Sequence, residues 1–111
     1  MVRALWIAVA VTLSTSASFA DEQSFVISCD RALQRAFDSA VAMIDVDRKR
    51  AHEAFHELAA RDQNCAAFHW GLAKTADDAE KAQRHRRDAY LAAAVANANQ
   101  IEWQKLEELP P

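Results

Sequence analysis

Two histidines and a glutamate in the middle of the chain have the types and the spacing needed to bind and use a metal ion. His52, Glu53 and His56 form the motif His-Glu-x-x-His. On a helix the two histidines lie one turn apart on the same side, where both can bind one zinc ion, and the glutamate can act as general base on a zinc-bound water. The motif therefore raises the hypothesis of a small zinc-dependent hydrolase, specifically a peptidase.

The sequence beyond the motif does not supply the further ligand that such an enzyme needs. A catalytic zinc is held by three protein ligands, and the residues three and six positions after His56 are Ala59 and Asp62, not the glycine and histidine of the extended motif. His69 and His85 stand alone, and we expect them to be packed or surface side chains. We therefore predict no catalytic residue, no resident metal and no cofactor, and the hydrolase remains the alternative hypothesis.

The two cysteines offer a second kind of chemistry. Arg3, the apolar run from Leu5 to Leu13 and the small residues ending at Ala20 have the layout of a cleavable secretory signal peptide. In an exported protein, an even number of cysteines indicates pairing. We predict a disulfide between Cys29 and Cys65 in a periplasmic or secreted protein; the alternative is two buried free thiols.

The size and charge of the expected mature chain limit its partners. Removal of the signal peptide, residues 1–20, leaves 91 of the 111 residues, which suits a single small domain over residues 21–111. Loss of Arg3 takes the formal net charge from −3 to −4, which argues against general binding of nucleic acid or anionic lipid. No second apolar run is long enough to span a membrane. We expect no nucleic-acid partner and no stable membrane anchor after cleavage.

Composition and pattern after the signal peptide predict an all-α domain. The region has a single glycine, Gly71, and its only prolines are the last two residues, whereas residues that favour helices are abundant. No stretch alternates polar and apolar residues over the length of a strand. We predict a domain of antiparallel helical hairpins.

Apolar spacing and capping residues locate the expected helices. Ser28 is expected to cap the first helix, Asp47 the second, and the sequence Thr75–Asp78 has the spacing of a capping box that opens the fourth. Asn97 and Asn99 mark a kink or break before a last amphipathic piece that stops at the proline pair. The expected helices cover about residues 28–44, 48–61, 65–75, 76–96 and 101–109.

Small and aromatic residues along the first three expected helices follow an order known from helical repeats. The matching residues are Ser28, Cys29, Ala51, Phe55, Leu58, the turn at residues 62–66 and the stretch His-Trp-Gly-Leu-Ala at residues 69–73. From Ser28 to Ala73 the chain resembles tetratricopeptide-repeat proteins, in particular exported ones. Gln63 stands where these proteins usually have proline, and the periodicity fades after Thr75, so the second unit is degenerate or is a capping helix.

The resemblance implies a protein-binding scaffold. Proteins of this kind pair antiparallel helices and bind another protein or a peptide on their concave face. The expected core between the first three helices comprises Phe37, Ala51, Phe55, Leu58, Trp70 and Leu72. In this interpretation His52, Glu53 and His56 lie on the flank or outer side of the second helix, away from Phe55. A structural protein without catalytic activity is a further alternative.

Overall fold

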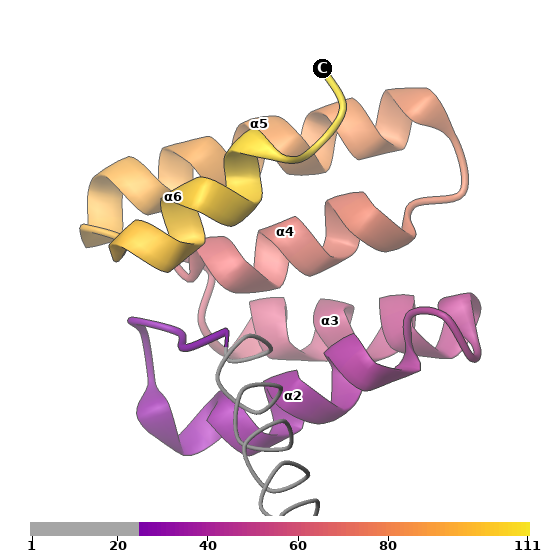
Figure 1. Ribbon diagram of the computed structural model, residues 1–111, viewed down its shortest axis with the longest axis horizontal. Coiled ribbons are helices and arrows are strands. Elements are labelled where there is room, and N and C mark those ends of the chain that lie inside the picture. The colour runs from indigo at the N-terminus through magenta and orange to yellow at the C-terminus, as the bar shows by residue number, and fades with distance from the viewer. Residues whose placement is uncertain (1–24) are drawn as a thin grey trace, which may run out of the picture.

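The computed structural model describes residues 25–111, which form five α-helices packed against one another (Figure 1). The elements are the 3-10 turn η2 (Arg31–Leu33) and the helices α2 (Gln34–Met43), α3 (Arg48–Arg61), α4 (Ala66–Thr75), α5 (Ala79–Ala96) and α6 (Gln100–Glu107). No strand occurs among these residues, so the prediction of an all-helical domain is confirmed. The expected signal peptide, residues 1–20, lies outside the described part of the chain.

Successive helices reverse direction and stack in sequence order. Figure 1 shows α2, α3, α4 and α5 one above another, with α6 lying in front of α5. Helix α4 is central, because it packs on α3 and α5 and also contacts α2 and α6. The chain before η2, residues 25–30, lies between α2 and α6. None of the helices within residues 25–111 has both the length and the apolar character that a membrane span requires.

Short polar side chains cap the helix starts, as predicted, but not always at the predicted residue. Asp47 caps α3 by accepting a hydrogen bond from the Arg50 amide, as predicted. The predicted cap of the fourth helix is wrong. Asp78 caps α5, whereas Thr75 ends α4 and donates its hydroxyl to the Gly71 carbonyl oxygen at 2.7 Å. A threonine can satisfy its hydroxyl on the preceding helical turn, so its side chain does not have to cap the next helix.

The first helix also begins later than expected. Asp30 caps η2, with its carboxylate 3.0 Å from the Ala32 amide nitrogen, and α2 follows from Gln34. Ser28 is not a cap, because its amide and hydroxyl both donate to the carboxylate of Glu102 in α6. Ser28, which the local sequence pattern predicted to be a helix cap, is therefore hydrogen-bonded to a residue distant in sequence instead.

The core has the composition that the sequence predicts. The six expected residues, Phe37, Ala51, Phe55, Leu58, Trp70 and Leu72, are all buried. Gly71 explains how closely α3 approaches α4, since a methyl group at this position would collide with the Phe55 ring. The only glycine of the chain therefore lies where the Phe55 ring occupies the space of a side chain.

Candidate functional site

Residues Phe25–Cys29, here called the N-terminal segment, pack on the helices without forming a helix, and the chain bends at Ser28 and Cys29. Phe25 and Ile27 are buried, with 6% and 1% of their surface exposed, whereas Val26 between them is 37% exposed. This alternation is that of a strand with one face on a core. The segment lies across α2, α4 and α6 without belonging to any helix.

Three side chains, here called the main-chain clamp, hold the backbone of the segment. Gln34 accepts from the Ile27 amide and donates to the Phe25 carbonyl oxygen, both at 2.9 Å. Asn99 donates to the Val26 carbonyl oxygen, also at 2.9 Å. Glu102 accepts from the Ser28 amide at 3.1 Å. The clamp, Gln34, Asn99 and Glu102, therefore pairs four main-chain groups of an extended peptide.

Each member of the clamp is itself positioned by a local hydrogen bond. The amide nitrogen of Gln34 also donates to Asp38, one helical turn further along α2, at 2.8 Å. Asn99 and Glu102 form a capping box at the start of α6, in which each side chain accepts from the backbone amide of the other. Asn97, in the left-handed region at φ 60°, ends α5 and turns the chain into this box.

An aromatic socket receives the first side chain of the segment. The Phe25 ring lies edge-on to Phe37 of α2 and to Trp70 of α4, with ring centroids 5.0 Å apart in both pairs. The Lys105 ammonium of α6 lies 5.7 Å from the centre of the Phe25 ring. Such edge-to-face and cation–π contacts favour an aromatic side chain at this position over an aliphatic one.

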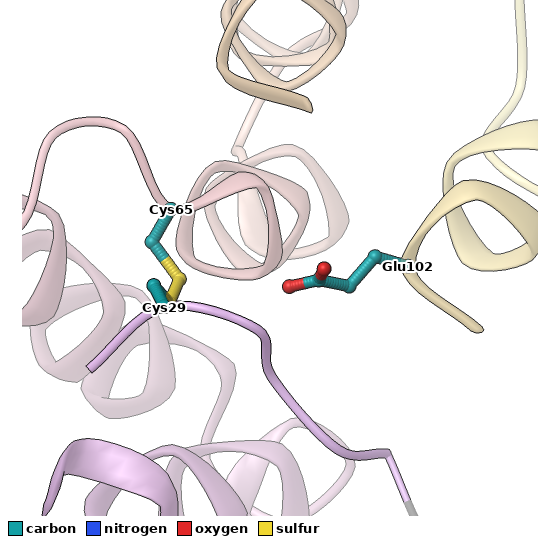
Figure 2. Close-up of side chains that lie close together, drawn as sticks. All are labelled: Cys29, Cys65 and Glu102. Carbon is teal, nitrogen blue, oxygen red and sulfur yellow. A yellow bond between two sulfur atoms is a disulfide. The ribbon is translucent and has the colours of Figure 1, made fainter. Parts of the chain in front are cut away.

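A disulfide ends the segment and anchors it to α4 (Figure 2). Cys29 and Cys65 are joined as expected, with Cα atoms 5.5 Å apart, inside the usual range for a bridge. One carboxylate oxygen of Glu102 lies within 4.8 Å of both sulfurs. Metal ions bind thiolates, and both sulfurs are used by the bridge. With the bridge formed, this trio therefore joins the segment, α4 and α6 and is not a metal site.

The buried carboxylate of Glu102 connects α6 to the N-terminal segment. It is 1% exposed, and its oxygens accept from the Ser28 hydroxyl at 2.6 Å, from the Ser28 amide and from the Asn99 amide. A buried carboxylate is tolerated when donors satisfy it in this way. Composition and helical periodicity gave no indication of this role for Glu102.

His52, the first histidine of the motif, is half-buried and not free on the outer side of α3. Its Nδ1 lies 2.8 Å from the Thr75 hydroxyl oxygen. The single hydroxyl hydrogen of Thr75 is donated to Gly71, so Nδ1 must donate and carries the proton. His52 Nε2 therefore keeps its lone pair. Burial, followed by the charge of His56, lowers the pKa of His52.

His85 of α5 packs against His52, although 33 residues separate the two in sequence. The ring centroids are 5.8 Å apart in an edge-on arrangement, and His85 Nδ1 is buried without a hydrogen-bond partner. Burial is the main cause that lowers the pKa of His85, and the charge of His52 adds to it, while the Asp88 carboxylate acts in the opposite direction. His85 is thus a packed side chain, as expected, but it does not stand alone, because it contacts His52.

The remaining residues of the motif, and the fourth histidine, occupy simpler positions. Glu53 and His56 are exposed on α3, as expected. His69 of α4 lies with Nε2 at 2.8 Å from the Gln63 carbonyl oxygen, which can only accept, so its Nδ1 has the lone pair. That atom is buried without a partner. The structure thus brings His52 together with His85, which the sequence did not suggest.

Comparisons with known proteins add no relative. No protein-family model, curated protein or solved structure matches this chain.

Proposed function

We propose that this chain is an exported helical-repeat protein that binds a segment of another protein in extended conformation. The binding surface is the one across α2, α4 and α6 that holds its own N-terminal segment. The observation that carries the proposal is the main-chain clamp, in which three side chains pair with four backbone groups of an extended peptide. Backbone groups are common to all sequences, so the clamp suits a foreign segment as well as its own.

The side-chain pattern of the segment defines the partner that would fit. In extended peptides bound this way, main-chain hydrogen bonds supply affinity and alternate side chains supply specificity. Here the side chains of Phe25 and Ile27 point into the domain and that of Val26 is exposed. The expected partner therefore carries an aromatic residue followed, two positions later, by a branched aliphatic one.

The resemblance to tetratricopeptide repeats supports the same conclusion. In that interpretation α2 with α3 and α4 with α5 are the paired helices of two units, and α6 is a capping helix. Such repeats bind peptides on a concave face, and here the N-terminal segment packs on α2 and α4. The side chains of Phe37 and Trp70, which surround Phe25, come from these two helices.

A peptide added in trans tests whether the surface is a receptor. The probe is a labelled synthetic peptide with the sequence of residues 21–27, and the protein is the chain of residues 21–111 carrying Phe25→Ala. Fluorescence anisotropy should show saturable binding, because loss of the Phe25 ring empties the aromatic socket and lets the chain's own segment be displaced from the clamp. Unmodified protein should bind the peptide at least about tenfold more weakly, because its own segment competes at high effective concentration.

Two matched controls distinguish specific recognition of the peptide from non-specific binding. A peptide with alanine at the position of Phe25 should bind poorly, and so should the intact peptide when Gln34→Ala is added to the protein. Equal binding of both peptides, or no saturable binding to any form of the protein, would contradict the proposal.

A further inference from the structure

The two packed histidines have the separation that a shared metal ion requires. Two imidazoles on one tetrahedral zinc, each with a Zn–N bond near 2.0–2.1 Å, have ring centres roughly 5 Å apart. The rings of His52 and His85 are 5.8 Å apart as they stand. The two rings are therefore close to the spacing of two imidazoles that share one ion between α3 and α5.

The hydrogen bonding of His52 prepares it as a ligand. Metal-binding histidines usually donate their second ring N–H to an oxygen, which fixes the tautomer and the ring orientation. His52 donates Nδ1–H to the Thr75 hydroxyl and presents Nε2 with its lone pair. The buried Thr75 is held in turn by the Gly71 carbonyl oxygen, so the orientation is set by two successive hydrogen bonds.

A third histidine of the same helix is not part of this pair. His56 follows His52 by one turn of α3, is exposed, and its charge acts on His52. The ring nitrogens of His52, His56 and His85 do not all lie within 4.8 Å of one another, so the site is defined by His52 and His85.

We propose that His52 and His85 form a two-histidine binding site for a divalent transition-metal ion of the zinc class that links α3 to α5, with water completing the coordination. Imidazole nitrogens favour zinc, copper and nickel among such ions. The site does not depend on the peptide-binding function, since it shares no residue with the main-chain clamp.

Charged groups of both signs surround the two histidines. The carboxylates of Asp77 and Asp88 act on His52 and His85 respectively and favour positive charge there. The charges of His56 and Lys81 act on His52 in the opposite sense, and those of His69 and Arg84 do so on His85.

Zinc titration of the chain of residues 21–111 tests the site. Calorimetry with zinc chloride should give one ion per chain, and thermal unfolding should shift to higher temperature, because an ion that binds only the folded form stabilises it. His85→Asn should weaken zinc binding by at least about tenfold, as should Thr75→Val through loss of the hydrogen bond that orients His52.

A variant that leaves both ligands in place distinguishes this site from non-specific zinc binding. Glu57→Gln changes an exposed side chain of α3 that is not a proposed ligand and should leave the affinity unchanged. The proposal is overturned if zinc binds with the same affinity to the unmodified and the His85→Asn proteins, or if it does not bind at all. If His85→Asn proves misfolded by circular dichroism, the NMR shifts of the His52 and His85 rings in the unmodified protein replace it. Rings that do not respond to one equivalent of zinc would equally overturn the proposal.

Discussion

The surface that holds the N-terminal segment and the histidines between α3 and α5 differ in how fully their polar atoms are used. In the clamp, the amide nitrogen of Gln34 donates twice and its oxygen accepts once, and both oxygens of Glu102 accept hydrogen bonds. At the histidines, buried Nδ1 atoms of His85 and His69 have no partner. The polar side-chain atoms of the clamp have hydrogen-bond partners, whereas buried nitrogens of the histidines do not.

That difference indicates what each region contributes. A buried polar group with all its partners is costly to disturb, because its loss leaves several donors unsatisfied. A buried group without a partner carries a penalty that a ligand can remove. Substitutions in the clamp should therefore lower stability as well as peptide binding, whereas substitutions at the histidines should act mainly on metal binding and on the response to pH.

The largest effect is expected where one side chain supports both regions. Phe55 of α3 packs on Gly71 and lies 5.8 Å and 6.3 Å, centroid to centroid, from Phe37 and Trp70, the two rings that hold Phe25. Phe55→Ala should lower the free energy of unfolding by about 3–5 kcal/mol. Chemical denaturation measures the change. A midpoint that hardly moves would show that the two regions do not share this core.

Removal of the disulfide should have the next largest effect and should act on the segment side alone. Replacement of Cys29 and Cys65 together by serine opens a loop with a sequence separation of 36 and should cost about 2–4 kcal/mol. Denaturation of the double variant measures it, with the oxidised unmodified protein as reference. The distance between His52 and His85, followed by NMR contacts between the rings, should not change. Loss of those contacts would mean that the regions are coupled.

Loss of the buried carboxylate tests whether the clamp is complete. Glu102→Ala leaves the Ser28 amide, the Ser28 hydroxyl and the Asn99 amide without their acceptor, and should lower the free energy of unfolding by about 2–3 kcal/mol. Glu107→Ala, at an exposed carboxylate of the same helix, is the matched control and should change it by less than about 0.5 kcal/mol. Equal changes in unfolding free energy for the two variants would mean that the hydrogen bonds of Glu102 do not stabilise the fold.

The smallest expected effect is on the pH dependence of stability. His52 and His85 have pKa values below those of the unfolded chain, near 6.5, so the unfolded state binds protons first as the pH falls. Stability from these groups is therefore fully present above about pH 6.5 and is lost as the pH falls through the lower folded-state values. His85→Asn should reduce the slope between pH 7 and pH 5. Parallel curves for the two proteins would remove the histidines as the cause.

Local signals in the sequence predicted most of the fold. The helical spacing of Phe37, Phe55 and Leu58 correctly identified buried positions, and Asp47 correctly marked a helix start. The caps at Ser28 and Thr75 were wrong, since each side chain has a partner elsewhere that its neighbours in sequence do not reveal. The predicted binding function and the export of the chain remain predictions.

Long-range pairs account for what the sequence did not predict at the candidate sites. Ser28 and Glu102 are 74 residues apart, and no periodicity connects them. The motif Asn-x-x-Glu at residues 99–102 did contain a signal, because it has the form of a capping box. His52 and His85 are 33 residues apart and come from different helices, so no periodicity within a helix indicates their contact.

The hydrogen bonds between Ser28 and Glu102 have a consequence for the order in which the domain is assembled. Synthesis runs from the N-terminus, so the segment is made before the helices that hold it, and α6, which carries Glu102, is the last helix made. Cys65 is available much earlier than Glu102, and the bridge to Cys29 does not need to wait for α6. Contacts between residues distant in sequence also form slowly. We therefore expect the middle helices to fold first and the two ends of the domain to close on each other last.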